Sequence, residues 1–368
     1  MPKLPLNVAA FAAPTKSENI YTKFQDYFKH YSAAVNGKKY GSYDTSVSLA
    51  QKEAEVNEDY LNEVQKLAHV KFDADTNMMA MAQHPTVKWA SMSIVDAMVE
   101  AIFPMTIIDS IGLYTEMKTG NYGDSFNFKV KPNSLFVVSK GANAQRTSFV
   151  QKQFQGDASL VPFNHVVTVE SSLYATLTGQ ESLAEFARKA AISIQTEMTK
   201  DAYNALTGTF KAATFPTQLT VTGYTTGDVL ALCQKVGAYN QGAKPVLAGT
   251  AVALSKVLPA GADGFRINTP ADNMSIRLIR DFYQYDVMEL PQVATGDYST
   301  YSTVLNDNEI YVLSPGSDKI IKGAFEGSTL TNSNDFYDNA NLTSNFTMNK
   351  RWEFGCITNS TAGIIKLQ

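Results

Sequence analysis

The sequence is poor in charged residues and nearly free of cysteine. Lys, Arg, Asp and Glu supply 18% of its 368 residues, whereas about a quarter is usual for a soluble domain. The two cysteines, Cys233 and Cys356, lie far apart and show no CxxC or Cys/His spacing. This pattern predicts neither a disulfide framework nor a zinc site. A surface with so little charge suits a protein that is covered by neighbouring subunits.

Basic clusters and long apolar runs are also missing. The formal net charge is -4 and no stretch is strongly basic, whereas a dedicated nucleic-acid-binding protein needs clustered Lys and Arg to displace counterions from phosphates. The first fifty residues carry a mild surplus of lysine, which fits either weak contact with DNA or a solvated arm. No apolar run approaches the roughly 20 residues of a membrane-spanning helix, so we expect no membrane partner.

The common catalytic motifs do not occur. GxGxxG, GxxxxGK[ST], HExxH and GxSxG are all absent, which argues against nucleotide cradles, zincin sites and the hydrolase elbow. No two of the four histidines have ligand spacing. His165 alternates with Phe163 and Val167 on a predicted strand, which favours a partly buried, hydrogen-bonded imidazole over a catalytic base. We therefore expect no enzyme activity, no catalytic residue, no cofactor and no metal.

Three helices are predicted before residue 105. Apolar residues recur at helical spacing from Ser17 to Gly37, and a second amphipathic pattern runs from Ser48 to His69. A third helix is expected from Val87 to Ile102, with Pro104 ending it because proline breaks the helical hydrogen-bond pattern. Neither of the first two helices buries enough surface to be stable alone.

A long β segment follows. Strands are expected at 107–117, 126–130, 135–138, 149–154 and 163–169, with turns at 121–123, Pro132 and Gly141. Its apolar side chains have few partners nearby in sequence. We therefore expect the loop to reach across to a neighbouring subunit, through the side chains of Phe126, Phe128, Val130, Arg146, Phe149 and Phe154.

The longest helix is predicted from Gly179 to Leu206. Thr178 and Glu181 form a capping-box pattern at its start, and Gly208 is expected to close it. At 1.5 Å per residue such a helix spans roughly 40 Å, so it would act as a spine. Its predicted buried stripe includes Leu183, Phe186, Ala190, Ile194 and Met198.

The remaining sequence is mixed. A helix capped by Thr225 and Asp228 precedes predicted strands at 246–248, 287–290 and 310–313. The segments 319–325 and 352–367 look like strands that return to the spine. No internal repeat is present. The fold class predicted from this order is α+β.

The order resembles the Hong Kong 97-type capsid fold of tailed bacteriophages. Specific stretches are similar to this family too, namely KPVLAGTAVALSKVLP (244–259), EIYVLSPGSDKIIKGAFEG (309–327) and RWEFGCITNSTAGIIKL (351–367). The resemblance covers roughly residues 87–368. It implies a helical N-terminal arm over 1–86, an extended β loop over 118–164 and an axial domain over 216–318. The peripheral domain would comprise 87–117, 165–215 and 319–368.

What the resemblance implies about function is a major capsid protein. Such chains assemble as hexamers and pentamers into an icosahedral shell around double-stranded DNA, with weak non-specific DNA contact and with scaffolding, portal or decoration proteins as further partners. The protein would be assembled in the host cytoplasm and located in the virion. The resemblance leaves open whether the arm is cleaved or retained, and whether Lys129, Lys131 or Lys140 forms a covalent link to a neighbour.

Three alternatives remain at this point. An encapsulin-type shell shares the fold but encloses cargo enzymes, so the absorbance ratio and size of purified shells would identify it. A soluble enzyme without a familiar motif would form a small oligomer with a cleft. A tail tube or sheath subunit would form helical tubes.

Overall fold

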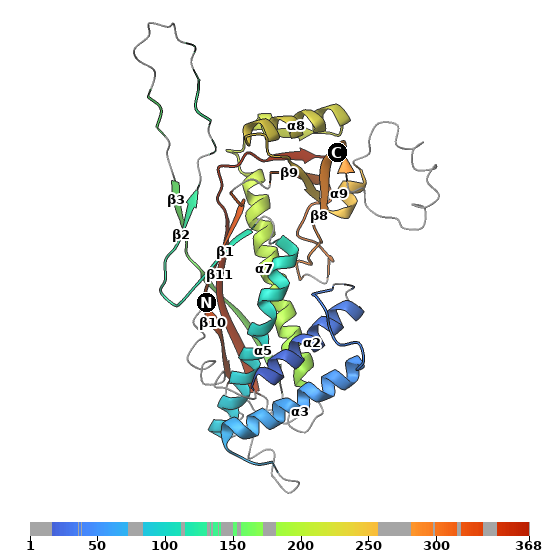
Figure 1. Cartoon of the computed structure of the whole chain (residues 1–368), viewed down its shortest axis with the longest axis vertical. Coiled ribbons are helices and arrows are strands. Elements are labelled where there is room, and N and C mark those ends of the chain that lie inside the picture. The colour runs from blue at the N-terminus through green and yellow to red at the C-terminus, as the bar shows by residue number, and fades with distance from the viewer. Residues whose placement is uncertain are drawn as a thin grey trace, which may run out of the picture.

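The computed structural model describes 17–35, 37, 39–72, 84–111, 115–130, 133, 135–138, 140, 150–152, 156–171, 182–256, 281–296, 299–314, 318–333 and 344–367. Within these residues the chain forms a helical layer, a four-stranded sheet, a six-stranded sheet and a two-stranded hairpin (Figure 1). The expected α+β class is confirmed. None of the described helices combines the length and apolar character that crossing a membrane requires.

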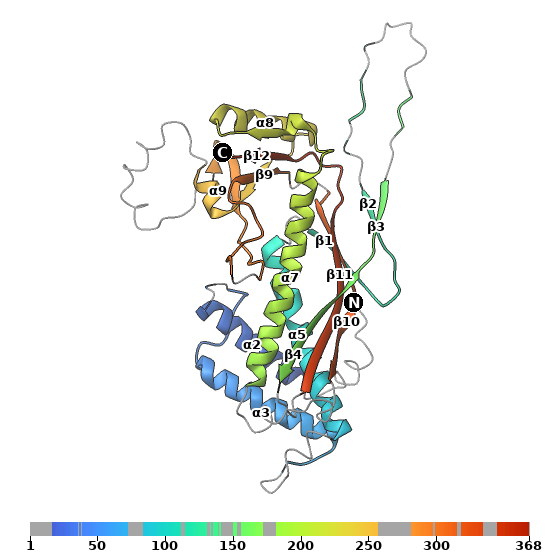
Figure 2. The same ribbon diagram turned by 180° about the vertical axis from the view of Figure 1, so that it is seen from behind.

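Four helices make up the helical layer. The two long helices α5 and α7 run along one face of the four-stranded sheet, and α2 and α3 cover their lower halves (Figures 1 and 2). Ser48 caps α3 with a capping box to Gln51, and His69 ends it in the left-handed conformation. The bounds are Ser17–Val35 for α2, Leu49–Ala68 for α3, Pro85–Ile111 for α5 and Leu183–Lys211 for α7.

Two helix boundaries differ from the predictions. Pro104 lies inside α5 and does not end it. Proline in a helix interior costs about 3 kcal/mol, and the packing of α5 against α3, α7 and β10 offsets this cost. Gly208 lies inside α7, because Phe210 in the next turn packs against Tyr311 and Phe215. The N-cap of α7 is Ser182, which accepts a hydrogen bond from the Glu185 backbone, and the predicted Thr178 cap lies outside the described residues.

The four-stranded sheet has the order β1-β10-β11-β4. β1 is parallel to β10, whereas β10 with β11 and β11 with β4 are antiparallel. The strand expected at 107–117 is only partly correct, because residues 107–111 form the end of α5. Trp352 of β11 is buried against the helical layer. The bounds are Thr115–Gly120 for β1, Phe163–Ser171 for β4, Ile321–Ser333 for β10 and Ser344–Cys356 for β11.

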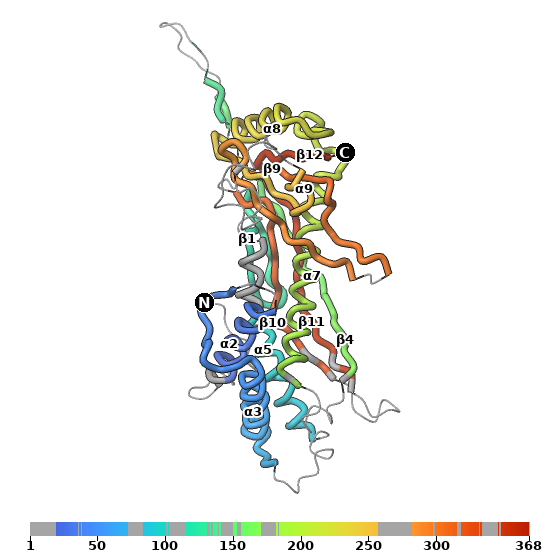
Figure 3. The backbone as a smooth tube through the Cα atoms, turned by 90° about the vertical axis from the view of Figure 1, so that its right-hand side faces the viewer, coloured from blue at the N-terminus to red at the C-terminus, as the bar shows by residue number. Residues whose placement is uncertain are grey.

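The six-stranded sheet lies beyond the upper end of α7, with α8 across its top (Figure 3). Its order is β5-β12-β9-β6-β8-β7. Thr225 caps α8 as predicted. The bounds are Thr217–Leu219 for the short helix η1, Thr226–Tyr239 for α8, Ala251–Ser255 for α9, Thr220–Thr222 for β5, Val246–Gly249 for β6, Asp281–Phe282 for β7, Tyr285–Glu289 for β8, Glu309–Leu313 for β9 and Gly363–Lys366 for β12.

The C-terminal strand differs from expectation. β12 pairs with β5 and β9 of the six-stranded sheet, although residues 319–368 were expected to lie together in the peripheral domain. Its side chains explain this, since Ile364 and Ile365 are fully buried, one on each face of the strand. Besides its passage along α7, the chain therefore crosses between the two sheets twice more, first between β9 and β10 and then at 357–362.

The hairpin of β2 (Phe126–Val130) and β3 (Gly156–Leu160) projects from the body of the molecule (Figures 1 and 2). The predicted alternation of β2 is confirmed, with Phe126, Phe128 and Val130 buried and the residues between them exposed. The succession of helical arm, projecting hairpin, long helix and second sheet is the one that the capsid resemblance implies.

Buried tyrosines make the helical layer sensitive to alkali. Burial raises the pKa of Tyr60 to about 12, and the hydrogen bond with Ser91 only partly opposes this. The free energy of unfolding that this pKa shift contributes is fully present below the ordinary pKa of 10 and is lost as pH rises toward 12. We therefore expect Tyr60→Phe to flatten the alkaline fall of the unfolding midpoint, as followed by circular dichroism. Identical profiles for variant and parent would contradict the prediction.

Candidate assembly surface

An apolar stretch lies exposed on the projecting loop beyond β2 and β3. The side chains of Leu135, Phe136, Val137 and Val138 are 57% to 92% exposed, and Val150 across the loop is 90% exposed. The stretch has no ladder partner among the described residues. The Gln151 side chain instead bonds both the N–H and the C=O of Val137, at 2.8 and 2.7 Å. This side-chain amide holds the two arms of the loop together.

Apolar side chains that are this exposed are stabilised when another surface covers them. Fully burying one Val, Leu or Phe side chain stabilises a structure by roughly 1.5–3 kcal/mol, and contiguous apolar patches on soluble proteins mark interaction sites. The stretch was predicted as a strand, but its four residues were not among the expected contact residues. The signal was present in the sequence as four consecutive apolar residues.

The base of the hairpin contacts its own chain. Phe126 and Phe128 are buried against Ala324 of β10, with Leu160 packed beside them. Leu160 also lies so close to Gly355 that a Cβ there would be 2.8 Å from its side chain. Phe126, Phe128 and Val130 are buried within their own chain, and their expected intersubunit role stays a prediction. The expected contacts Arg146, Phe149 and Phe154 lie outside the described residues.

Asn133 ties the loop to the six-stranded sheet. Its side-chain amide donates to Asn240 Oδ1 at 2.7 Å and to the Tyr239 carbonyl at 3.1 Å. The buried Asn240 in turn donates to the Thr361 carbonyl and accepts from the Thr361 N–H, at 2.7 and 2.8 Å. The loop, the end of α8 and the second crossing between the sheets thus meet at one asparagine. No sequence motif marks it.

Replacing Asn240 should loosen this connection. In Asn240→Ala the Thr361 N–H and C=O lose their partner, which costs about 1–3 kcal/mol for buried groups. We expect faster amide hydrogen exchange at 133–138 and 359–362, measured by mass spectrometry. Asn164→Ala on β4, whose amide makes only a long 3.4 Å contact, is the control. Unchanged exchange in the loop would contradict the prediction.

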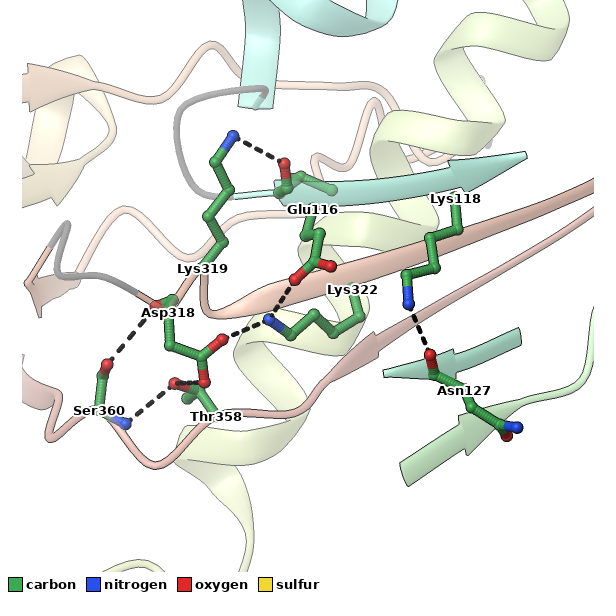
Figure 4. Close-up of polar contacts among 9 residues, drawn as sticks. Glu116, Lys118, Asn127, Asp318, Lys319, Lys322, Thr358 and Ser360 are labelled. Carbon is green, nitrogen blue, oxygen red and sulfur yellow. Dashed lines mark hydrogen bonds and ion pairs between the residues drawn. The ribbon is translucent and has the colours of Figure 1, made fainter. Parts of the chain in front are cut away.

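A buried lysine joins the strands beside the first crossing (Figure 4). Lys322 of β10 is fully buried, and its Nζ lies 2.5 Å from Asp318 Oδ1 and 2.8 Å from Glu116 Oε2 of β1. Asp318 also accepts hydrogen bonds from Thr358 and Ser360 in the second crossing. Burial alone would lower the pKa of Lys322, but the hydrogen bonds with both carboxylates outweigh it and raise the pKa. One ammonium group therefore links both crossings to β1.

The predicted spine stripe lies inside the chain. Ala190, Ile194 and Met198 are buried in the main core, and Phe186 is partly buried against it. The backbone of Leu183 begins α7, but its side chain is outside the described part of the structure. These residues hold α7 to α5 and β11, so their role is packing within one subunit.

His165 lies in a polar contact between β4, β11 and α7. Its ring stacks on Trp352 with centroids 3.7 Å apart. Asp201 Oδ2 lies 3.3 Å from its Nε2 and accepts the Trp352 Nε1 hydrogen bond at 2.8 Å. Burial, together with Asp201, raises the pKa of Glu353 nearby. The imidazole is partly buried and bonded, as predicted, at the edge of a surface hollow of about 420 Å³. Among the described residues no cluster of three potential metal ligands occurs.

Comparison with protein families gives a match over most of the chain. The sequence profile of the family described as "SPbeta prophage-derived putative capsid protein YonB" matches residues 38–366, nearly the whole chain.

The chain belongs to the YonB family of capsid proteins. The predicted relation to phage capsid proteins is thereby confirmed. A search of curated proteins finds no match.

Solved capsid structures are similar to this YonB-family chain at low identity. The capsid of the native GTA particle is 14% identical, with a TM-score of 0.48 over 70% of this chain and 89% of that one. The mature capsid of bacteriophage PhiM1 is 10% identical, with a TM-score of 0.46 over 69% and 86%. The head structure of Helicobacter pylori bacteriophage KHP40 is 10% identical, with a TM-score of 0.46 over 71% and 91%.

Proposed function

We propose that this chain is the structural subunit of an icosahedral shell that encloses the double-stranded DNA of a tailed phage. The exposed stretch 135–138 carries the proposal, because four consecutive apolar side chains stand away from the body with no partner in the described chain. Membership of a capsid protein family supports the same reading. The family favours a phage capsid over an encapsulin-type compartment or an enzyme.

The proposed division of the chain follows the sheets. The peripheral domain comprises α5, α7 and the four-stranded sheet, with α2 and α3 as the arm packed on it. The axial domain is the six-stranded sheet with α8 and α9, including β12 from the end of the chain. The hairpin and the residues beyond it form the extended loop.

Contact with DNA would be weak and non-specific. The net charge of -4 leaves no surplus of positive charge, and affinity for phosphates requires clustered cations. Hexamers and pentamers of the chain would form the shell, which places the protein in the virion after assembly in the host cytoplasm. Scaffolding, portal and decoration proteins are further partners in this proposal.

Assembly of the purified chain tests the proposal. We expect the parent to form closed megadalton particles, seen by sedimentation and negative-stain microscopy, and the double variant Phe136→Ser/Val138→Ser to remain as small species with an unchanged circular dichroism spectrum. Val252→Ser, an exposed valine on α9, is the control and should assemble. A parent that stays a monomer at high concentration would contradict the proposal.

A further inference from the structure

We propose that the free edge of β4 in one subunit accepts residues 135–138 of a second copy of this chain as an added strand. This inference rests on the proposed function and specifies the surface that the extended loop contacts. The added strand would become a fifth strand of the four-stranded sheet, next to β4.

The edge is open in the described structure. β4 is the terminal strand of its sheet and pairs only with β11, over all nine of its residues. In an antiparallel ladder alternate residues direct both N–H and C=O away from the partner strand. The outer side of β4 therefore presents a row of backbone donors and acceptors to an incoming strand.

The two edges of the sheet differ in charge. Proteins usually protect exposed edge strands with charged residues, proline or bulges. The opposite edge follows this rule, because β1 carries Glu116 and Lys118. From Phe163 to Val169, β4 contains no Asp, Glu, Lys, Arg or Pro. Glu170 near the end of β4 is its only acidic residue, and the seven residues before it form an edge of the kind expected for a strand that is covered after assembly.

The exposed side chains of β4 fit a strand that is apolar on both faces. Phe163 is 64% exposed and Val166 is 52% exposed. They lie three residues apart, so they point to opposite faces of the sheet. A strand with alternating polarity could cover only one of them. Four consecutive apolar residues, such as 135–138, place two side chains on each face.

The occupant must come from another copy. The coloured trace of 135–138 lies beyond β2 and β3 on an arm of the projecting loop, whereas β4 runs from the hairpin base in the opposite direction (Figures 1 and 2). The sequence Phe-Val-Val has high strand propensity, and it carries no charge that would need solvation. Because donor stretch and acceptor edge are different surfaces, the contact is heterologous and closes into rings when the rotation permits.

Cysteine pairs test the contact in assembled particles. Val138→Cys is combined with Val166→Cys or with Thr168→Cys, two positions on the same face of β4. Each subunit both donates and accepts a strand, so mild oxidation should give a ladder of covalent multimers on a non-reducing denaturing gel. Val138→Cys combined with Val252→Cys on α9 is the matched control and should give none. All variants retain Cys233 and Cys356, so the control also reports any linkage through them.

Hydrogen exchange of the parent gives a second measurement without substitutions. We expect amides of 163–169 to be protected at least tenfold more in particles than in unassembled subunits. Particles with neither a ladder nor protection of β4 would overturn the strand contact while the capsid function stands. A parent that forms no particles would overturn both.

Discussion

Replacing Trp352 with alanine should lower the free energy of unfolding by about 3–5 kcal/mol, the usual range for a buried aromatic residue. Trp352 is one of the largest fully buried side chains. The change would leave a cavity in the main core, remove the stacked contact with His165 and deprive Asp201 of a 2.8 Å hydrogen bond. These three losses act at the junction of β4, β11 and α7, so they should loosen the whole peripheral sheet.

The chain offers a matched control, because its only other tryptophan is exposed. Trp89 on α5 is 50% exposed, and Trp89→Ala should change stability by less than about 1 kcal/mol, as surface substitutions usually do. Urea unfolding of unassembled subunits, followed by circular dichroism, measures both. Equal midpoints for the two variants would show that Trp352 does not hold the sheet to the helices.

Replacing Lys322 with methionine should destabilise the chain by about 3–5 kcal/mol, because removing one partner of a buried ion pair leaves the other charge uncompensated. Methionine keeps most of the side-chain volume, so the loss would report charge and not a cavity. Asp318 would remain largely buried with only its hydroxyl partners. Glu116, which is 41% exposed, can turn to solvent.

Lys244→Met is the comparison for this prediction. Lys244 pairs with Asp286 at 3.2 Å on the surface, and exposed pairs contribute only about 0–1 kcal/mol. Urea unfolding at neutral pH should separate the two variants clearly. The raised pKa of Lys322 sets the pH window, since its contribution is fully present below the ordinary value of 10.5 and is lost as pH rises above it. Equal stability of the two variants would contradict the conclusion that Lys322 is a buried charge held by two carboxylates.

The sequence predicted correctly those elements whose boundaries depend on residues close to them in the chain. The bounds of the helix between Ser48 and His69 and the Thr225 cap were predicted correctly, because the residues that set them lie within a few positions of the helix ends. The alternation of β2 was readable for the same reason. Pro104 and Gly208 gave wrong boundaries because the packing that overrides them comes from distant residues. β12 was assigned to the wrong sheet because strand pairing between 220–222 and 363–366 leaves no local signal.

The candidate surface was predicted in part. The sequence placed an apolar β loop between the third helix and the spine, but it could not say which apolar residues the chain itself covers. Phe126 and Phe128 belong to the covered group because Ala324 and Leu160 lie against them. Leu135–Val138 belong to the exposed group. The contact of Asn133 with Asn240 and the pairing of Lys322 with Glu116 had no sequence signal, since the partners lie more than 100 residues apart in the chain.

The sequence by itself determined the α+β class and the order of the elements, because these depend on periodicity, caps and their succession along the chain. That order, together with three specific stretches, carried the resemblance to capsid proteins. Only the tertiary structure decided which apolar side chains remain exposed, which edge of the sheet is open and which buried charges are paired. Burial depends on what packs against a residue from elsewhere in the chain, and the local pattern of a strand is the same whether that partner is its own sheet or another subunit.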